Sequence, residues 1–90
     1  MSENIDISVV VPLYNEAESL PELMERIDRV AVANGLGYEV LMIDDGSTDA
    51  SWSVIEELGQ RYSTLRALSF MHNYGKSAAL YVGFEMARGE

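Results

Sequence analysis

The sequence predicts an α/β domain in which helices cover both faces of a parallel β-sheet. Three short apolar runs are each followed by a segment of helical period, and their starts lie about thirty residues apart, close to the length of a βαβ unit. The runs span residues 7–11, 39–43 and 65–71. Their apolar residues are continuous, which is typical of parallel strands buried on both sides. We therefore expect three βα units with right-handed crossovers, forming an incomplete doubly wound domain that lacks a fourth strand.

Turn-forming residues separate the expected strands. The first run, ISVVV, is closed by Pro12. The second run, EVLMI, follows Asn34, Gly35 and Gly37, which are residues that favour turns. The third run, LRALSFM, is the longest of the three.

The segments between the strands carry apolar residues at i, i+3, i+4 and i+7, the spacing of helices that pack against a sheet. Ser19 and Glu22 match a capping box, and Pro21 falls in the first turn of the same helix. Small residues in the third stripe would allow close approach to the sheet, and Tyr81 and Phe84 are expected to be core or half-buried. The three stripes are Leu20, Leu23, Met24, Ile27, Val30 and Ala31; Val54, Ile55, Leu58 and Tyr62; and Ala79, Leu80, Gly83 and Ala87.

The composition restricts the classes of function. Fifteen acidic and six basic residues give a net charge of −9, which argues against binding nucleic acid or anionic lipid through a basic face. The absence of cysteine excludes disulfides and thiolate metal sites. The N-terminus does not resemble a signal peptide, and no apolar run approaches the ~20 residues of a membrane-spanning helix. We expect one soluble domain over residues 1–90, located in the cytoplasm.

Two polar loops follow the first two strands and indicate a binding site. They span residues 12–16 and 44–49, and the second begins with the adjacent acids Asp44 and Asp45. Ligands of open α/β sheets bind outside the carboxyl ends of the strands, where both loops should lie. Carboxylates there could accept hydrogen bonds from a ribose hydroxyl or a base N–H, and an aromatic side chain could stack on a base. Alternatively, the two acids form a solvated turn, and Thr48 or Asp49 caps the second helix.

Three segments, in order, resemble a known family. VVVPLYNEAESLPEL, EVLMIDDGSTDASWSVIEEL and NYGKSAALYVGFEMARGE are similar to the N-terminal half of family 2 glycosyltransferases, most of all to the dolichyl- or polyprenyl-phosphate sugar transferase branch. The resemblance covers residues 7–90. It implies a Rossmann-like, glycosyltransferase A-type fold and inverting transfer of a sugar from a nucleotide-sugar donor to an acceptor such as a polyprenyl phosphate.

The resemblance also implies a donor site. The residues at positions that bind the nucleotide sugar in the family are Pro12, Tyr14, Glu16, Ile43, Asp45 and Lys76. Asp45 would contact the base or ribose, Ile43 would contact the nucleotide through its backbone, and Lys76 would lie near the diphosphate, whereas Asp44 would support the loop. His72 stands where family members often carry arginine, so an electrostatic contact made by that arginine is in doubt.

The family's metal motif, Asp-x-Asp, occurs nowhere in these ninety residues. The resemblance implies Mg²⁺ or Mn²⁺ for a longer parent enzyme, with the metal ligands, the catalytic base and the acceptor site all outside this chain. We therefore expect no catalytic residue here and no transferase activity from the chain alone. For the parent we expect the cytoplasmic face of a membrane.

Two further expectations follow. A different class of function, a non-catalytic binding or assembly module, fits the same ninety residues. In the family's sheet a fourth strand lies beside the first, so the edge of residues 7–11 should be open here. Because that segment is apolar and uncharged, we expect the chain to self-associate through it.

Overall fold

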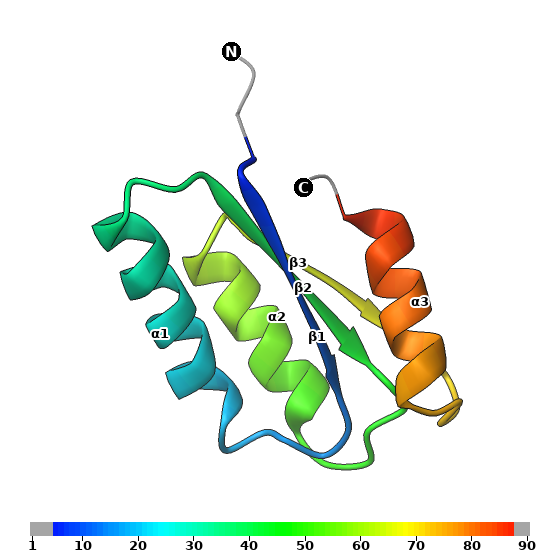
Figure 1. Ribbon diagram of the computed structural model, residues 1–90. Coiled ribbons are helices and arrows are strands. Elements are labelled where there is room, and N and C mark those ends of the chain that lie inside the picture. Colours follow the sequence, from blue (N-terminus) through cyan, green and yellow to red (C-terminus); the bar gives the residue numbers. More distant parts are fainter. Residues whose placement is uncertain (1–4, 88–90) are drawn as a thin grey trace.

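The computed structural model describes residues 5–87, which form three βα units around one parallel sheet (Figure 1). The sheet order is β1-β2-β3, and helices α1 and α2 cover one face while α3 covers the other. The elements are β1 (Ile7–Leu13), α1 (Leu20–Ala33), β2 (Tyr38–Asp44), α2 (Ser51–Arg61), β3 (Leu65–Ser69) and α3 (Lys76–Met86). The predicted α/β class with parallel strands is confirmed.

The central strand, β2, organises the core because it is paired on both sides and covered on both faces. All seven of its residues are buried. On one face Val40 and Met42 join a core cluster with residues of α1 and α2, including Met24 and Ile55. On the other face Ile43 lies beneath Gly83 of α3. This burial explains why the β2 sequence is continuously apolar.

The structure corrects the expected strand boundaries and one helix cap. β1 extends to Leu13 and includes Pro12, which an edge strand tolerates because it is paired on one side only. β3 ends at Ser69, two residues before the end of the expected run. The capping box does not form, because the Ser19 hydroxyl donates to Glu16 instead of capping α1.

The expectation that the two α3 aromatics are core or half-buried is wrong. Tyr81 and Phe84 are 67% and 64% exposed. Among the described residues, α3 buries only Ala79 and Gly83 fully, so its close contact with the sheet is made by small side chains, as the sequence predicted.

A buried carboxylate near the start of β2 helps to hold the C-terminal end of α3 on the sheet. Glu39 is 1% exposed and accepts hydrogen bonds from the Ser8 hydroxyl at 2.5 Å and from the Arg66 guanidinium at 2.9 Å. The same guanidinium donates to the Met86 carbonyl oxygen at 2.6 Å. A buried charge needs such partners to offset its lost hydration, so Glu39 and Arg66 together hold the C-terminal end of α3 on the sheet.

We predict that Gly83→Ala destabilises the fold by overpacking the contact between α3 and β1. The new Cβ would lie 2.3 Å from Cγ1 of Val10, so one of the two elements must shift. We expect a loss of about 1–3 kcal/mol in the free energy of unfolding, measured by urea titration.

Gly59→Ala in α2 is the matched control, because its Cβ would meet nothing within 4 Å. Removing a helical glycine there should stabilise the chain by up to about 1 kcal/mol. Equal effects of the two substitutions would contradict the proposed close contact, whereas relief of the Gly83→Ala loss by Val10→Ala would support it.

Candidate functional site

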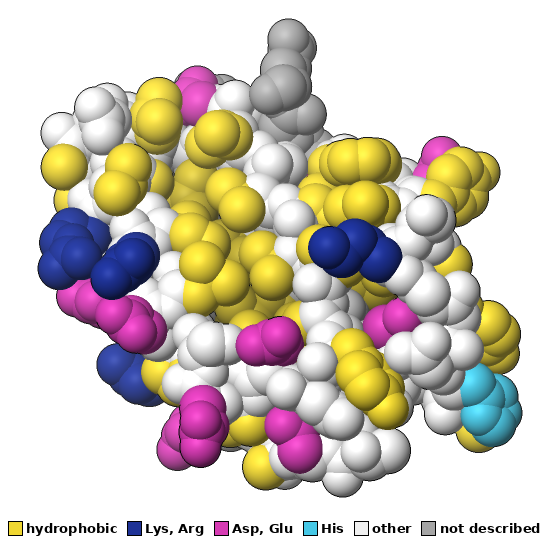
Figure 2. Space-filling model, turned by 60° about the horizontal axis from the view of Figure 1, so that its bottom comes forward, with side chains coloured by type: hydrophobic (Ala, Val, Ile, Leu, Met, Phe, Trp, Pro, Cys, Tyr) yellow, Lys and Arg dark blue, Asp and Glu magenta, His cyan; other side chains and the backbone are white. Residues whose placement is uncertain are grey.

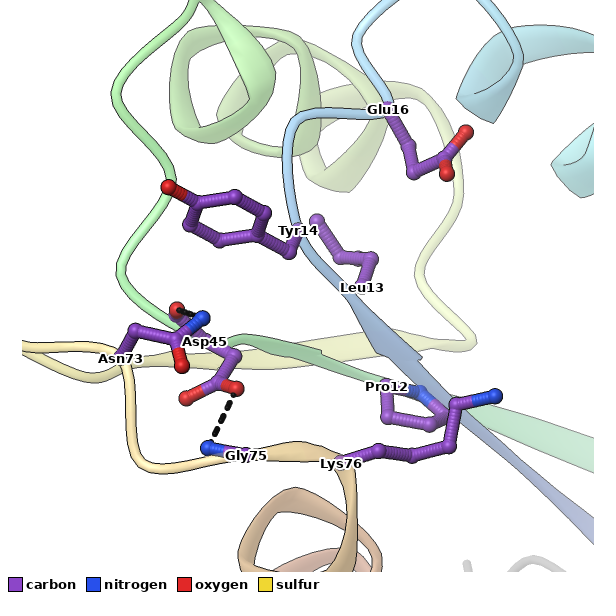
Figure 3. A pocket seen from close by; sticks show the side chains of 8 residues that line it. All are labelled: Pro12, Leu13, Tyr14, Glu16, Asp45, Asn73, Gly75 and Lys76. Carbon is purple, nitrogen blue, oxygen red and sulfur yellow. Dashed lines mark hydrogen bonds between the residues drawn. The ribbon is translucent and has the colours of Figure 1, made fainter.

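A cavity of about 400 Å³ opens at the carboxyl ends of β1 and β2 (Figure 3). Its walls come from the loop after β1, the end of β2 and the segment that leads into α3. The lining residues are Pro12, Leu13, Tyr14, Glu16, Asp45, Asn73, Gly75 and Lys76. Five of the six predicted site residues therefore meet in one cavity. Ile43 is not among them, since it is fully buried in β2, and its backbone contact with a nucleotide stays a prediction.

Asp45 links the end of β2 to the segment before α3. Its side chain is buried, and its two carboxylate oxygens accept the backbone N–H groups of Tyr74 at 2.7 Å and Gly75 at 2.8 Å. The Asn73 side chain also donates to the Asp45 carbonyl oxygen at 3.2 Å. These bonds bring Asn73 and Lys76 to the cavity wall. Each carboxylate oxygen keeps a second lone pair, so Asp45 can still accept a hydrogen bond from a ligand.

Asp44 has the supporting role that was expected of it. It is 1% exposed, and its Oδ1 atom accepts the backbone N–H of Ser47 at 2.8 Å, within its own loop. The two adjacent acids are thus hydrogen-bonded to different segments, which offsets the cost of burying two like charges. The alternative of a solvated turn at Asp44 and Asp45 is wrong because both are buried.

Gly46 permits the contact between these segments. It adopts φ +78°, and a Cβ atom there would lie 2.7 Å from the carbonyl carbon of His72 and 2.8 Å from the backbone nitrogen of Asn73. Only glycine combines this left-handed backbone with so close an approach of two main chains.

The first loop contributes an aromatic ring and a carboxylate. Tyr14 is 44% exposed, so its ring is accessible at the cavity. The Glu16 carboxylate accepts the Ser19 hydroxyl at 2.9 Å.

The N-cap residue of α2 is Ala50, which makes no side-chain cap hydrogen bond, so the cap considered at Thr48 or Asp49 is wrong. Asp49 lies one residue before that N-cap. Its carboxylate accepts the Ser51 amide at 2.8 Å and the Ala17 amide at 3.4 Å. Hydrogen bonds, first of all from the Ser51 side chain, hold the pKa of Asp49 below its usual value.

Sequence reasoning missed Asn73 and Gly75 as cavity residues, and it included Leu13 only as part of the loop 12–16. A cavity role for Leu13 itself was not expected. A usable signal was present for Asn73 and Gly75, because they precede a helix at the carboxyl end of the third strand. Within residues 5–87, no group of three His, Cys, Asp or Glu residues could hold a metal ion. No helix in that same range is long and apolar enough to cross a membrane.

This fold is an α/β domain whose candidate site lies at the carboxyl edge of a parallel sheet, where ligands of such sheets bind. The family model for glycosyl transferase family 2 matches residues 8–90. The chain therefore belongs to glycosyl transferase family 2, and the predicted family and fold class are confirmed.

Curated relatives include undecaprenyl-phosphate 4-deoxy-4-formamido-L-arabinose transferases. The protein of Pseudomonas aeruginosa (strain LESB58) is 40% identical over 85 residues, which are 93% of this chain and 25% of that protein. The protein of Klebsiella pneumoniae (strain 342) is 41% identical over 85 residues, covering 93% of this chain and 26% of the relative. The chain thus spans about a quarter of the length of these relatives.

Two solved structures show the same architecture with ligands. S. aureus TarS 1–349 in complex with UDP-GlcNAc matches with a TM-score of 0.78 and 25% identity, over 96% of this chain and 24% of that one. The mannosyltransferase PcManGT from Pyrobaculum calidifontis, in complex with GDP-Man and Mn²⁺, matches with a TM-score of 0.71 and 25% identity, over 100% of this chain and 29% of that one.

We predict that Gly46→Ala displaces the segment before α3 and opens the cavity. The added Cβ would collide with the backbone of His72 and Asn73, so the Tyr74 and Gly75 amides should lose their bonds to Asp45. We expect both amide resonances to shift in ¹H–¹⁵N spectra, and a loss of about 1–3 kcal/mol in unfolding free energy.

Gly35→Ala is the matched control for backbone strain. Gly35 also has a positive φ, +66°, but an added Cβ there meets nothing within 4 Å. The loss of unfolding free energy in Gly35→Ala therefore gives the cost of a side chain in the left-handed conformation alone. The Tyr74 and Gly75 amide resonances should not move. A Gly46→Ala loss no larger than that of Gly35→Ala would contradict the close approach.

Proposed function

We propose that this chain is the donor-nucleotide half of an inverting glycosyltransferase, which transfers a sugar from a nucleotide sugar to an acceptor. The observation that carries the proposal is the meeting of Tyr14, Glu16, Asp45 and Lys76 around one cavity of a family 2 fold. The complexes of TarS with UDP-GlcNAc and of PcManGT with GDP-Man support a nucleotide-sugar ligand.

Each cavity residue has a role that suits its chemistry. The exposed Tyr14 ring stacks on the base, and the Asp45 carboxylate accepts a base N–H or a ribose hydroxyl. Lys76 contacts the diphosphate. Pro12 and Glu16 complete the nucleotide pocket, and Ile43 contributes through its backbone only, because its side chain is buried.

A divalent cation belongs to the proposed parent reaction but not to this part of the site. PcManGT carries Mn²⁺ in its complex, which supports a metal in the family. The described residues do not fit such an ion, since no group of three candidate ligands occurs among them. We place the ligands of Mg²⁺ or Mn²⁺, and the catalytic base, in a part of the parent enzyme outside this chain.

The acceptor that we propose is a polyprenyl phosphate. Relatives about 40% identical to this chain are named undecaprenyl-phosphate 4-deoxy-4-formamido-L-arabinose transferases, which supports a lipid-phosphate acceptor. An enzyme with that acceptor and a nucleotide-sugar donor would work at the cytoplasmic face of a membrane. A non-catalytic binding module, the alternative function, would use the same cavity without any acceptor.

We predict weak nucleotide binding that depends on Tyr14 and Asp45. Without the metal site, UDP or GDP should bind in about the millimolar range, near −4 kcal/mol, in an NMR titration. Tyr14→Ala should lower the affinity about fivefold or more, because stacking on an aromatic ring contributes ~1–3 kcal/mol per base. Asp45→Ala should abolish measurable binding.

Glu57→Ala is the control, since Glu57 is an exposed acid on α2 that does not line the cavity. It should bind like the unmodified chain. Shifts that map away from residues 12–16, 43–46 and 73–76, or that survive Asp45→Ala, would place the nucleotide elsewhere.

We also propose that the 90-residue chain self-associates through β1, with a second copy as the partner. Among the described residues β1 pairs with no strand other than β2, and we propose that its other edge receives the partner. A hollow of about 310 Å³ lies beside this edge, and Figure 2 shows hydrophobic side chains gathered there. Its lining is Ile7, Val9, Arg26, Ile27, Val30, Ala31, Leu36 and Tyr38.

Antiparallel pairing of two β1 strands would bury both hollows in one two-fold interface. No residue of β1 is charged. Pro12 has no amide hydrogen, so we place the pairing at residues 7–11.

We predict that light scattering detects a dimer whose population rises with salt, because salt screens the repulsion between two chains of charge −9. Val30→Glu should shift the chain towards monomer, since Val30 lines the hollow and is 59% exposed. Val32→Glu is the matched control, because Val32 is on the same helix and 66% exposed but does not line the hollow. A folded monomer at low and high salt would overturn this interface.

A further inference from the structure

Asn15 lies between two cavity residues, Tyr14 and Glu16, in a backbone conformation that most residues avoid. Its φ is +55°, and within the described residues it is the one non-glycine residue with positive φ. Asparagine tolerates this left-handed region better than most side chains, but the conformation still needs support from neighbouring groups. That support comes from the other loop of the site.

The Asn15 side chain spans the gap between the loops after β1 and β2. Its Oδ1 atom accepts the backbone N–H groups of Thr48 at 2.8 Å and Asp49 at 3.2 Å, just before α2 begins. Its Nδ2 atom donates to the Thr48 hydroxyl at 3.3 Å. Because two backbone donors require an oxygen acceptor, these contacts fix the orientation of the side-chain amide.

The backbone around Asn15 makes further hydrogen bonds across the same gap. The Asn15 amide donates to the Ser47 hydroxyl at 2.8 Å, and the Glu16 amide donates to the hydroxyl of the fully buried Ser51 at 2.9 Å. These bonds join the loop after β1 to the loop after β2 and to the first residue of α2. Asn15 takes part through both its backbone and its side chain: its N–H donates to Ser47, and its side-chain oxygen accepts from the Thr48 and Asp49 amides.

We infer that Asn15 is a positioning residue, which locks the two loops together and so holds Tyr14 and Glu16 at the donor cavity. Asn15 does not itself line that cavity. It lines a second hollow, together with Ala17, Ser19 and Asp49, so its effect on the donor cavity passes through the neighbouring Tyr14 and Glu16. The effect on nucleotide binding rests on the proposed function, whereas the lock itself is a property of the free protein.

The decisive substitution is Asn15→Gly, which keeps the positive φ at no steric cost but removes the side chain. In the free protein, the Thr48 and Asp49 amides should exchange with solvent roughly fivefold faster, the factor that corresponds to one net hydrogen bond of ~1 kcal/mol. The Ser47 amide, held by Asp44, is the internal control and should not change. The amide resonances of Tyr14 and Glu16 should shift.

Two comparison variants separate positioning from general stability. Asn15→Asp keeps the acceptor oxygens and should restore slow exchange of the Thr48 and Asp49 amides. Gly35→Ala lowers stability through backbone strain far from the loops and should leave the site resonances in place.

UDP and GDP titrations then test the consequence for binding. Asn15→Gly should weaken nucleotide affinity about fivefold or more, with Asn15→Asp and Gly35→Ala close to the unmodified chain. Unchanged exchange in Asn15→Gly would overturn the lock, and faster exchange with unmoved Tyr14 and Glu16 resonances would overturn the positioning role. If the unmodified chain bound neither nucleotide, the proposed function would fail, while the exchange rates and resonances would still decide the role of Asn15.

Discussion

The burial of β2 is the constraint on which the rest of the structure depends. A strand with all seven residues buried must be paired on both edges and covered on both faces. Parallel pairing with β1 and β3 requires crossover helices, and these place the loops after all three strands at one edge of the sheet. The cavity forms at that edge because Asp45 emerges there between the loops after β1 and β3.

Two carboxylates hold α3 at its two ends. One is Glu39 of β2, and the other is Asp45, the residue that follows β2. The fully buried residues of this helix are the small Ala79 and Gly83, so polar bonds at its two ends add to its packing on the sheet. At its C-terminal end, Glu39 binds Arg66, which also donates to the Met86 carbonyl. At the N-terminal end of α3, the Asp45 carboxylate accepts hydrogen bonds from the backbone N–H groups of Tyr74 and Gly75, which come just before the helix. The position of Lys76 at the cavity is therefore set by polar bonds from the central strand.

The sequence predicted the parts of the fold and site that depend on local pattern. Apolar runs and helical stripes gave the three βα units. The polar loops at the strand ends contain Pro12, Tyr14, Glu16 and Asp45 of the cavity wall, whereas Lys76 was indicated by the family resemblance. Periodicity could not reveal which hydrogen bonds a side chain makes across space. Ser19 therefore looked like a helix cap although it bonds to Glu16, and Asn15 gave no sign that it reaches residues 33 and 34 positions away.

The sequence also failed for Tyr81 and Phe84, whose exposure depends on which face of α3 meets the sheet. Large apolar side chains normally mark the buried face of a helix. Here the sheet is approached so closely at Gly83 that a methyl group would collide with Val10, and only small side chains fit that face. The aromatic rings consequently point outward. A stripe of small residues was the better indicator of the buried face.

The charges that line the cavity suit one part of the proposed nucleotide-sugar donor, the nucleoside, better than its diphosphate. Asp45 and Glu16 make the cavity acidic, and Lys76 is the cation that lines it. Acidic acceptors suit the N–H and hydroxyl donors of a nucleoside, whereas a diphosphate in a chain of charge −9 needs more positive charge than one lysine supplies. The described residues offer no metal site to supply it. This distribution of charge supports the proposed binding of a nucleoside by the residues of this cavity.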